Sequence, residues 1–367
     1  MKEWKRLGFG CMRLPVIDGK NNQIDLDQFM RMTDYFLEQG YRYFDTAYPY
    51  HEQTSEKAVG KVLVGRHDRS SFLLADKMPV RFVQKSEDYQ RIWDEQLSRT
   101  QAGFFDYYLL HAMNGQRYED TKRLGGFGFV KGLQEKGLIH HLGMSFHDSA
   151  AVLDTILDEH PELEFVQIQL NYLDWDDPKV QSRLCYETIR RHGRKVWVME
   201  PLKGGLLANL PPEAHAMLGG GEDARWGLRF VAQLEGVEMI LSGMHSVQQV
   251  KENVETFNHL EPLDAGEMER IVQVREYLRK TVKIGCTSCR YCVAGCPRGI
   301  EIPKFFELYN QQALFPAMHA RFQQSYDMQA HKPSECIRCH KCAKACPQHL
   351  AIPELFDEVR AAFSDHR

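Results

Sequence analysis

The residues with the clearest chemistry are cysteines, and eight of the ten lie after residue 285 in this 367-residue chain. They form two runs with one spacing, C-x2-C-x2-C-x3-C-P, and each cysteine of the second run follows its counterpart by 50 residues. A disulfide scaffold would spread its cysteines along the chain, whereas thiolates gathered this way are typical of a metal centre in a reducing, cytoplasmic compartment. The runs are Cys286, Cys289, Cys292 and Cys296, then Cys336, Cys339, Cys342 and Cys346.

The repeat resembles the two-cluster ferredoxins, and its long connection is similar to the α-helical ferredoxin type. Zinc sites favour two CxxC pairs, not three closely spaced cysteines and a Cys-Pro. In such ferredoxins the fourth cysteine of each run ligates the other cluster. The resemblance therefore implies two 4Fe-4S clusters with crossed ligands. One set is Cys286, Cys289, Cys292 and Cys346; the other is Cys336, Cys339, Cys342 and Cys296.

Residues 284–349 contain eight Lys and Arg against four Asp and Glu, in a chain whose net charge is -4. These cations have two interpretations. They offset the charge of the clusters, or they form a dock for an acidic electron carrier such as a ferredoxin or a flavodoxin.

Four further residues could do acid–base chemistry, because each follows or ends a short apolar run: Asp45, Tyr50, Lys77 and His111. A phenol is a weak acid, and an adjacent ammonium lowers its pKa. A carboxylate would hold that ammonium, and an imidazole would orient a carbonyl substrate. Such a set protonates a carbonyl oxygen while hydride reaches the carbon.

The elements that must position these residues are eight apolar runs separated by helical patterns. Nearly continuous apolar runs are typical of strands buried on both faces. Eight strand–helix units predict an α/β fold, a (β/α)8 TIM barrel over 1–280, with a doubly wound sheet as the alternative. A small, mainly α-helical ferredoxin-like domain follows over 281–367. The runs are 6–12, 41–47, 71–78, 105–112, 139–146, 165–172, 195–202 and 237–244. The helical stretches are 26–39, 55–63, 87–101, 126–136, 149–159, 178–192, 222–233 and 264–280.

Asp45-Thr-Ala-x-x-Tyr50, Lys77 in LLADKM, His111 in YYLLHA and the GMS at 143–145 resemble the aldo-keto reductase family, over residues 5–260. The whole chain is similar to the branch of that family with a ferredoxin-type tail. The resemblance implies a barrel that binds NAD(P)H without a Rossmann fold. It implies that Tyr50 is the general acid, that Lys77 lowers its pKa and that Asp45 pairs with Lys77, while His111 orients the substrate.

The resemblance also implies cofactor contacts. Ser145 and Gln167 match the positions that bind the nicotinamide amide, and Met199 takes the place of a stacking aromatic. Gly204 and Gly205 allow close approach to a pyrophosphate. Gly243 and Gln249 replace basic residues, so NADH is expected to bind at least as well as NADPH. The adenine-end positions are Ser242, Gly243, Gln249 and Asn253. Near the substrate we expect Tyr48 and Met113, ahead of Met12 and Trp175.

Composition limits the other functions. No apolar run approaches the roughly 18 residues of a membrane span, no signal peptide is evident, and the small net charge does not favour nucleic acid or a membrane as partner. The leading hypothesis is a cytoplasmic oxidoreductase that interconverts a carbonyl and an alcohol with NAD(P)(H). Two alternatives stay open: an electron-transfer or redox-sensing protein whose barrel only binds nucleotide, and a barrel that binds flavin.

Overall fold

The computed structural model describes residues 5–286, 290–346 and 348–363, and the chain divides into two compact units. The first unit is Met1–Leu207 with Ala224–Asp264; the second is Ala208–Asp223 with Ala265–Arg367. The domain boundary expected near residue 280 falls after α11 (Ala265–Lys280), a helix that groups with the second unit.

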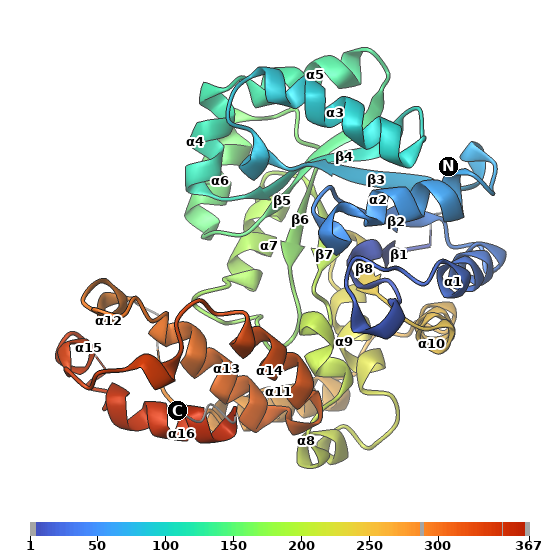
Figure 1. Ribbon diagram of the computed structural model, residues 1–367. Coiled ribbons are helices and arrows are strands. Elements are labelled where there is room, and N and C mark those ends of the chain that lie inside the picture. Colours follow the sequence, from blue (N-terminus) through green and yellow to red (C-terminus); the bar gives the residue numbers. More distant parts are fainter. Residues whose placement is uncertain (1–4, 287–289, 347, 364–367) are drawn as a thin grey trace. The chain divides into compact units, whose positions relative to one another are not determined.

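The first unit is a closed barrel of eight parallel strands in sequence order, with β8 pairing back to β1 (Figure 1). This confirms the predicted (β/α)8 fold. The strands are β1 Leu7–Gly10, β2 Tyr43–Asp45, β3 Leu73–Met78, β4 Phe105–Met113, β5 Ile139–Phe146, β6 Phe165–Gln169, β7 Lys195–Met199 and β8 Val237–Gly243.

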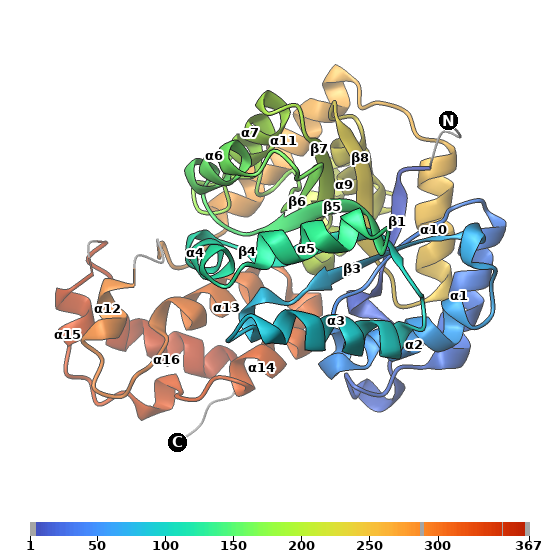
Figure 2. The same ribbon diagram turned by 90° about the horizontal axis from the view of Figure 1, so that it is seen from above.

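Helices surround this barrel on its outside (Figures 1 and 2). Some of them begin at a side-chain cap or end beside a glycine. Asp25 accepts the Gln28 N–H at 2.9 Å to start α1, and Gly137 follows α5 with a φ of 69°. The helices are α1 Leu26–Glu38, α2 Ser55–Val59, α3 Glu87–Thr100, α4 Gly115–Arg123, α5 Gly126–Glu135, α6 Ala150–Glu159, α7 Ser182–Arg191, α9 Asp223–Ala232 and α10 Val247–Asn258.

The interior of the barrel is filled by side chains, as in other packed (β/α)8 cores. The indole N–H of Trp197 donates to the Tyr43 hydroxyl at 3.1 Å, so these large polar-tipped rings are satisfied inside the apolar core. This plug leaves the carboxyl ends of the strands for chemistry. Its buried members are Tyr43, Ala75, Leu109, Phe165, Trp197, Met239 and Leu241.

The second unit is helical and repeats its own backbone every 50 residues. The short helix α12 (Tyr291–Ala294) corresponds to α15 (Lys341–Lys344), and α13 (Ile302–Leu314) to α16 (Ile352–Ala362). The repeat extends to left-handed residues, since the φ of Arg290 is 66° and that of His340 is 56°. The predicted internal repeat is therefore also a repeat of structure. The remaining helices are α8 Pro212–Met217 and α14 His319–Asp327.

The structure differs from the expected elements mostly at boundaries. Strands are shorter, because β2 covers Tyr43–Asp45 where 41–47 was expected. Helix α7 begins at Ser182, after a polar turn, instead of at 178. Helices α4, α8, α10, α12, α14 and α15 were not predicted. None of the helices in the described part of the chain has the length and apolar character needed to cross a bilayer.

Candidate functional site

The four predicted acid–base residues meet at the carboxyl ends of neighbouring strands. Asp45 ends β2, Lys77 is the penultimate residue of β3, and His111 lies near the end of β4. Tyr50 begins the 3-10 turn Tyr50–Gln53 that follows β2. The lysine ammonium donates to Asp45 Oδ1 at 2.5 Å and to the Thr46 carbonyl at 2.7 Å, and lies 3.3 Å from the Tyr50 hydroxyl.

Lys77 and Asp45 form a buried ion pair. Burial by itself lowers the pKa of Lys77, but the charges of Asp45 and Tyr50 outweigh it and raise that pKa above its ordinary value. Burial also raises the pKa of Asp45, against the opposing effect of Lys77. The ammonium beside Tyr50 is therefore permanently charged at neutral pH.

Tyr50 remains a protonated phenol. Burial raises its pKa above the usual 10, and the charge of Lys77 only partly reverses this. The sequence led us to expect a lowered pKa, and the contribution of Lys77 has that sign, but the loss of solvation is larger. A tyrosine that keeps its proton until a negative oxygen develops beside it is suited to act as an acid.

His111 faces this phenol edge-on, with ring centroids 6.0 Å apart. Burial lowers the pKa of His111 well below its usual value, and the nearby cations Lys77, Arg81 and Arg117 add to the effect. The imidazole is therefore neutral near pH 7 and can donate one N–H to a carbonyl oxygen. Arg81 and Arg117 are mouth residues that the sequence interpretation did not include.

Ser145 and Gln167 lie opposite each other on β5 and β6 and are buried. Ser145 Oγ accepts the Ala112 N–H at 2.7 Å, so its hydroxyl proton is free to donate to another group. Gln167 Oε1 is buried and accepts no hydrogen bond from any described residue. Buried polar atoms usually have partners, so this pair fits a ligand with an amide, such as a nicotinamide.

The predicted pyrophosphate and adenine positions follow β7 and β8. Met199 ends β7, and the turn after it contains Gly204 and Gly205 at positive φ, 64° and 93°. Ser242 accepts a hydrogen bond from the Asn253 side chain at 2.9 Å. Gln249, in α10, accepts the His245 N–H at 3.0 Å.

Arg13 is a cation at this end of the barrel that the sequence interpretation missed. Its side chain packs against the exposed Gly243, where an added Cβ would lie 3.0 Å from Arg13 Cδ. The guanidinium pairs with Glu200 at 3.2 Å and is one-third exposed. A basic residue directly after the first predicted strand was the available signal.

Of the four residues expected near the substrate, three make contacts within the protein and one is exposed. The Tyr48 hydroxyl donates to Glu95 of α3 at 2.7 Å, and Met113 is fully buried. Trp175 packs its ring against Phe230. Met12, by contrast, is 53% exposed and is therefore the better candidate for contact with a ligand.

In the second unit the cysteines line two apolar cavities, each drawn from both runs. One is lined by Cys296 of the first run and three cysteines of the second, Cys336, Cys339 and Cys342. The other is lined by Cys286 and Cys292 with Cys346 of the second run; Cys289 lies outside the described residues. Ile302 reaches both cavities. None of the described cysteines forms a disulfide, so the donor set fits iron–sulfur clusters with crossed ligands.

Among the described residues, no group of three or more His, Cys, Asp or Glu side chains is arranged to hold a metal ion.

Known proteins match the two parts of the chain separately. Residues 6–276 match the model of the aldo/keto reductase family, and residues 285–352 match that of a 4Fe-4S dicluster domain. A soybean (Glycine max) protein described as probable aldo-keto reductase 1 is 28% identical over 182 residues, 47% of this chain and 49% of its own. The alignment thus spans about half the length of that relative.

Solved structures share the fold. The holo form of an aldo-keto reductase from Bacillus halodurans is 26% identical, with a TM-score of 0.59 over 73% of this chain and 91% of its own. An aldo-keto reductase from Klebsiella pneumoniae in complex with NADPH is 18% identical, with a TM-score of 0.58 over 74% and 90%. With the family model covering most of the chain, the protein belongs to the aldo/keto reductase family.

Proposed function

We propose that the barrel interconverts a small carbonyl compound and its alcohol with NAD(P)(H). The observation that carries this proposal is the connected set of Asp45, Lys77 and Tyr50, with the neutral ring of His111 beside the phenol. Charge and protonation state both match the reaction. Tyr50 holds a proton to give, and the cation next to it stabilises the phenolate that remains.

When bound, a reduced nicotinamide would supply the hydride that the carbonyl carbon receives in the reducing direction. Tyr50 donates its Oη proton to the carbonyl oxygen, and the Lys77 ammonium stabilises the negative charge left on Tyr50. Asp45 keeps Lys77 charged and oriented, and His111 donates an N–H that holds the carbonyl oxygen. In the oxidising direction Tyr50 takes the proton back.

The chain's own residues fit the cofactor along one end of the barrel. Ser145 and Gln167 would bind the carboxamide, and Met199 would lie beside the ring. Gly204 and Gly205 would approach the pyrophosphate. Ser242, Gly243, Gln249 and Asn253 would surround the adenine end.

The experiment is replacement of Tyr50 by Phe, assayed by NADPH and NADH oxidation with a panel of reactive aldehydes. We expect turnover to fall by about 10²–10⁴-fold, the usual contribution of a positioned acid. Binding of the reduced cofactor, followed by its fluorescence, should not change. Unchanged turnover would reject the proposal.

We further propose two 4Fe-4S clusters in the tail, on the two crossed cysteine sets. The two cavities and the match to a dicluster domain support this. Protein purified without oxygen should contain about eight irons per chain; zinc in place of iron would refute it. An acidic carrier, a ferredoxin or flavodoxin, is the proposed electron partner, and cysteines without disulfides together with the proposed clusters fit a cytoplasmic location.

A second function is electron transfer or redox sensing, with a barrel that binds nucleotide but reduces no carbonyl. The cysteine-lined cavities favour it, because clusters move single electrons whereas nicotinamide moves two as hydride. The test is to add NADH or NADPH to anaerobic protein without substrate. Bleaching of the cluster absorption would support electron transfer, and an unchanged spectrum would support a structural role for the clusters.

A further inference from the structure

Behind the catalytic lysine, on the outer face of the barrel, two carboxyl groups are buried side by side. Asp76 of β3 and Glu56 of α2 are each 0% exposed. Successive strand residues point to opposite faces. Lys77 therefore points to the mouth, while Asp76 points outward to α2 and α3. The mechanism above uses neither carboxyl.

The backbone of Lys77 needs partners at this point. Strand β2 pairs with β3 only as far as Ala75, whose carbonyl accepts the Thr46 N–H at 3.0 Å. Lys77 lies two residues further on, so its N–H and C=O face the same side, where β2 has ended. A buried backbone group without a partner is costly.

Side chains of the outer face replace the missing strand. Asp76 Oδ1 accepts the Lys77 N–H at 2.8 Å, and the Gln96 amide donates to the Lys77 carbonyl at 3.0 Å. Gln96 in turn donates to Glu56 Oε1 at 3.2 Å and accepts the Tyr108 hydroxyl at 2.5 Å. The network thus fixes both backbone groups of Lys77, the lysine that contacts Asp45 and Tyr50.

The second oxygen of Asp76 makes this network unusual. No described residue donates a hydrogen bond to Asp76 Oδ2, and the group facing it is the Glu56 carboxyl. Two buried carboxylates cannot hydrogen-bond without a proton between them. Burial raises the pKa of both carboxyls, but Arg99 Nη1 lies 2.9 Å from Glu56 Oε2 and opposes the rise there, so the arrangement favours the proton on Asp76.

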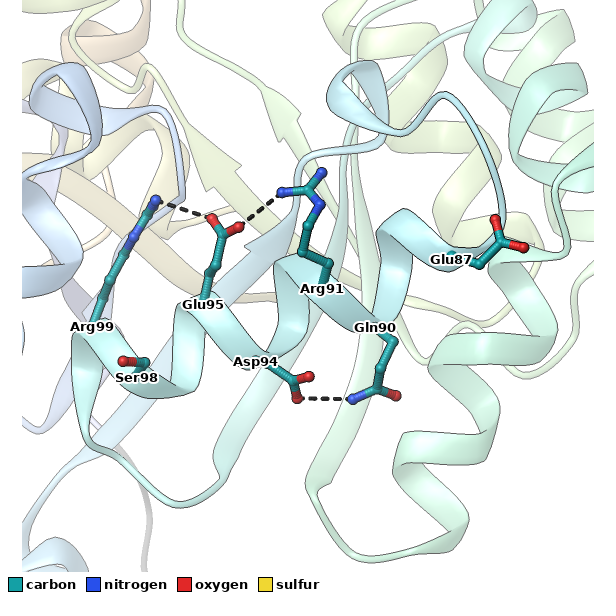
Figure 3. Close-up of a pocket in the computed structure, with 7 residues that line it drawn as sticks. All are labelled: Glu87, Gln90, Arg91, Asp94, Glu95, Ser98 and Arg99. Atoms are coloured by element: carbon teal, nitrogen blue, oxygen red, sulfur yellow. Dashed lines mark hydrogen bonds and ion pairs between the residues drawn. The ribbon is translucent and has the colours of Figure 1, made fainter.

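Arg99 links the buried pair to the surface. Its other nitrogen reaches Glu95, which also pairs with Arg91, along the solvent-facing side of α3 (Figure 3). The helix therefore supplies a fixed cation to Glu56 and none to Asp76. The titratable and charged groups facing the pair are Arg99 from α3, Lys77 from β3, Tyr108 from β4 and Cys11 from the turn after β1.

We propose that Asp76 and Glu56 share one proton and that Asp76, as a neutral acid, is a positioning residue that holds the backbone of Lys77. Burial and the charge of Glu56 raise the pKa of Asp76 well above its usual value. A raised pKa means that the folded protein keeps a proton that the unfolded chain releases. Stability therefore falls as the pH rises from the ordinary Asp pKa toward the raised one.

The test compares Asp76→Asn with Asp76→Leu. Asparagine keeps an acceptor for the Lys77 N–H and brings its own N–H donor to Glu56, so it imitates the protonated acid without a proton to lose. Leucine removes both contacts at similar size. Asp106→Asn is the matched control, since Asp106 is a buried aspartate on neighbouring β4 whose carboxylate accepts from Arg69 and the Leu74 N–H.

Two measurements do not depend on activity. Infrared difference spectra at pH 8 should show the C=O stretch of a protonated carboxylic acid that Asp76→Asn removes and Asp106→Asn retains. Urea unfolding should show that the wild type loses stability with rising pH more steeply than Asp76→Asn does. Absence of the band, or equal slopes, would overturn the shared proton even if the protein reduces aldehydes.

The positioning role rests on the proposed function and has its own readout. Asp76→Leu should lose turnover at least tenfold while its NADPH affinity is kept, and Asp76→Asn should restore it. Asp76→Asn should also stay active to higher pH than the wild type. Full turnover in a folded Asp76→Leu protein would refute the positioning role. If the wild type turns over no aldehyde, only the proposed function has failed.

Discussion

The barrel and the cysteine-rich unit prepare their chemical groups in opposite ways. In the barrel, Lys77 already has three neighbours at bonding distance, and its backbone is held from behind by Asp76 and Gln96. In the tail, cysteines from two distant runs surround small apolar cavities with Ile302 between them. One site is complete as a protein structure; the other is a set of ligands around a space.

The two units also differ in the interactions that stabilise them. The barrel buries a large core, and hydrogen bonds offset the cost of burying the polar residues of its site. The tail is short, and in small metal-binding domains ligand binding supplies much of the folding energy. Removal of the iron should therefore destabilise the tail while leaving the barrel folded.

The largest effect is expected from iron removal. Anaerobic chelation should loosen the tail, because the thiolates left behind no longer bind a common iron centre and repel one another, while the barrel keeps its core. Limited proteolysis should then cut after residue 280 and leave a stable fragment. A tail that resists protease equally with and without iron would show that its apolar contacts suffice.

Lys77→Met probes the opposite unit. We expect a loss of turnover of about 10³-fold, within the range of acid catalysis. Loss of one partner of a buried pair also destabilises by about 3–5 kcal/mol, because the Asp45 charge stays behind. The double variant with Asp45→Asn is the control. It should recover stability in urea without recovering turnover, and recovered turnover would contradict the assignment.

Cys346→Ser tests the crossing of the two runs. Cys346 lines the cavity of Cys286 and Cys292, so the cluster held by the first run should be lost and iron should fall from about eight to about four per chain. Paramagnetic resonance identifies the surviving cluster. Cys185→Ser, a buried thiol in α7, is the control and should keep all the iron. Loss of the cluster on Cys336, Cys339 and Cys342 instead would mean local ligation.

Much of the fold could be predicted because its signals are local. Most of the strands are nearly continuous apolar runs, and the cysteine repeat follows directly from a constant offset of 50. Boundaries could not be predicted where tertiary pairing decides them; β2 stops at Asp45 because the chain leaves the sheet there. Helix α10 was missed, although Ser246 caps it through the Gln249 N–H at 3.2 Å.

For the site, motifs place Asp45, Tyr50, Lys77 and His111 at the mouth, and the structure brings them together. What the motifs cannot show is which residues approach from elsewhere in the chain. Arg13 meets Gly243 only because β1 closes the barrel against β8. Asp76 looks like a solvent-facing neighbour of Lys77 until α2 brings Glu56 against it. Tyr48 was expected in the substrate pocket because it is close to Tyr50 in sequence, but its hydroxyl donates to Glu95 of α3.

The smallest expected effect concerns cofactor choice. Because Gly243 and Gln249 offer no charge, NADH should bind at least as well as NADPH. Arg13 is a cation that packs on Gly243. The glycines after β7 lie at the same end of the barrel, so we expect the guanidinium to face the pyrophosphate that both cofactors share. Arg13→Gln should then weaken both by a similar factor, about tenfold, which is the worth of one charge-assisted hydrogen bond.

Fluorescence titration of both reduced cofactors measures the ratio directly. Arg66→Gln is the matched control, since Arg66 pairs with Asp34 outside the barrel mouth and should leave both affinities unchanged. A selective loss of NADPH binding would place Arg13 at the 2′-phosphate, and the barrel would then have to be counted as an NADPH site. An equal loss of affinity for NADH and NADPH would support a barrel mouth that is formed before the cofactor binds. Arg13 would then strengthen the binding of either nucleotide without selecting between them.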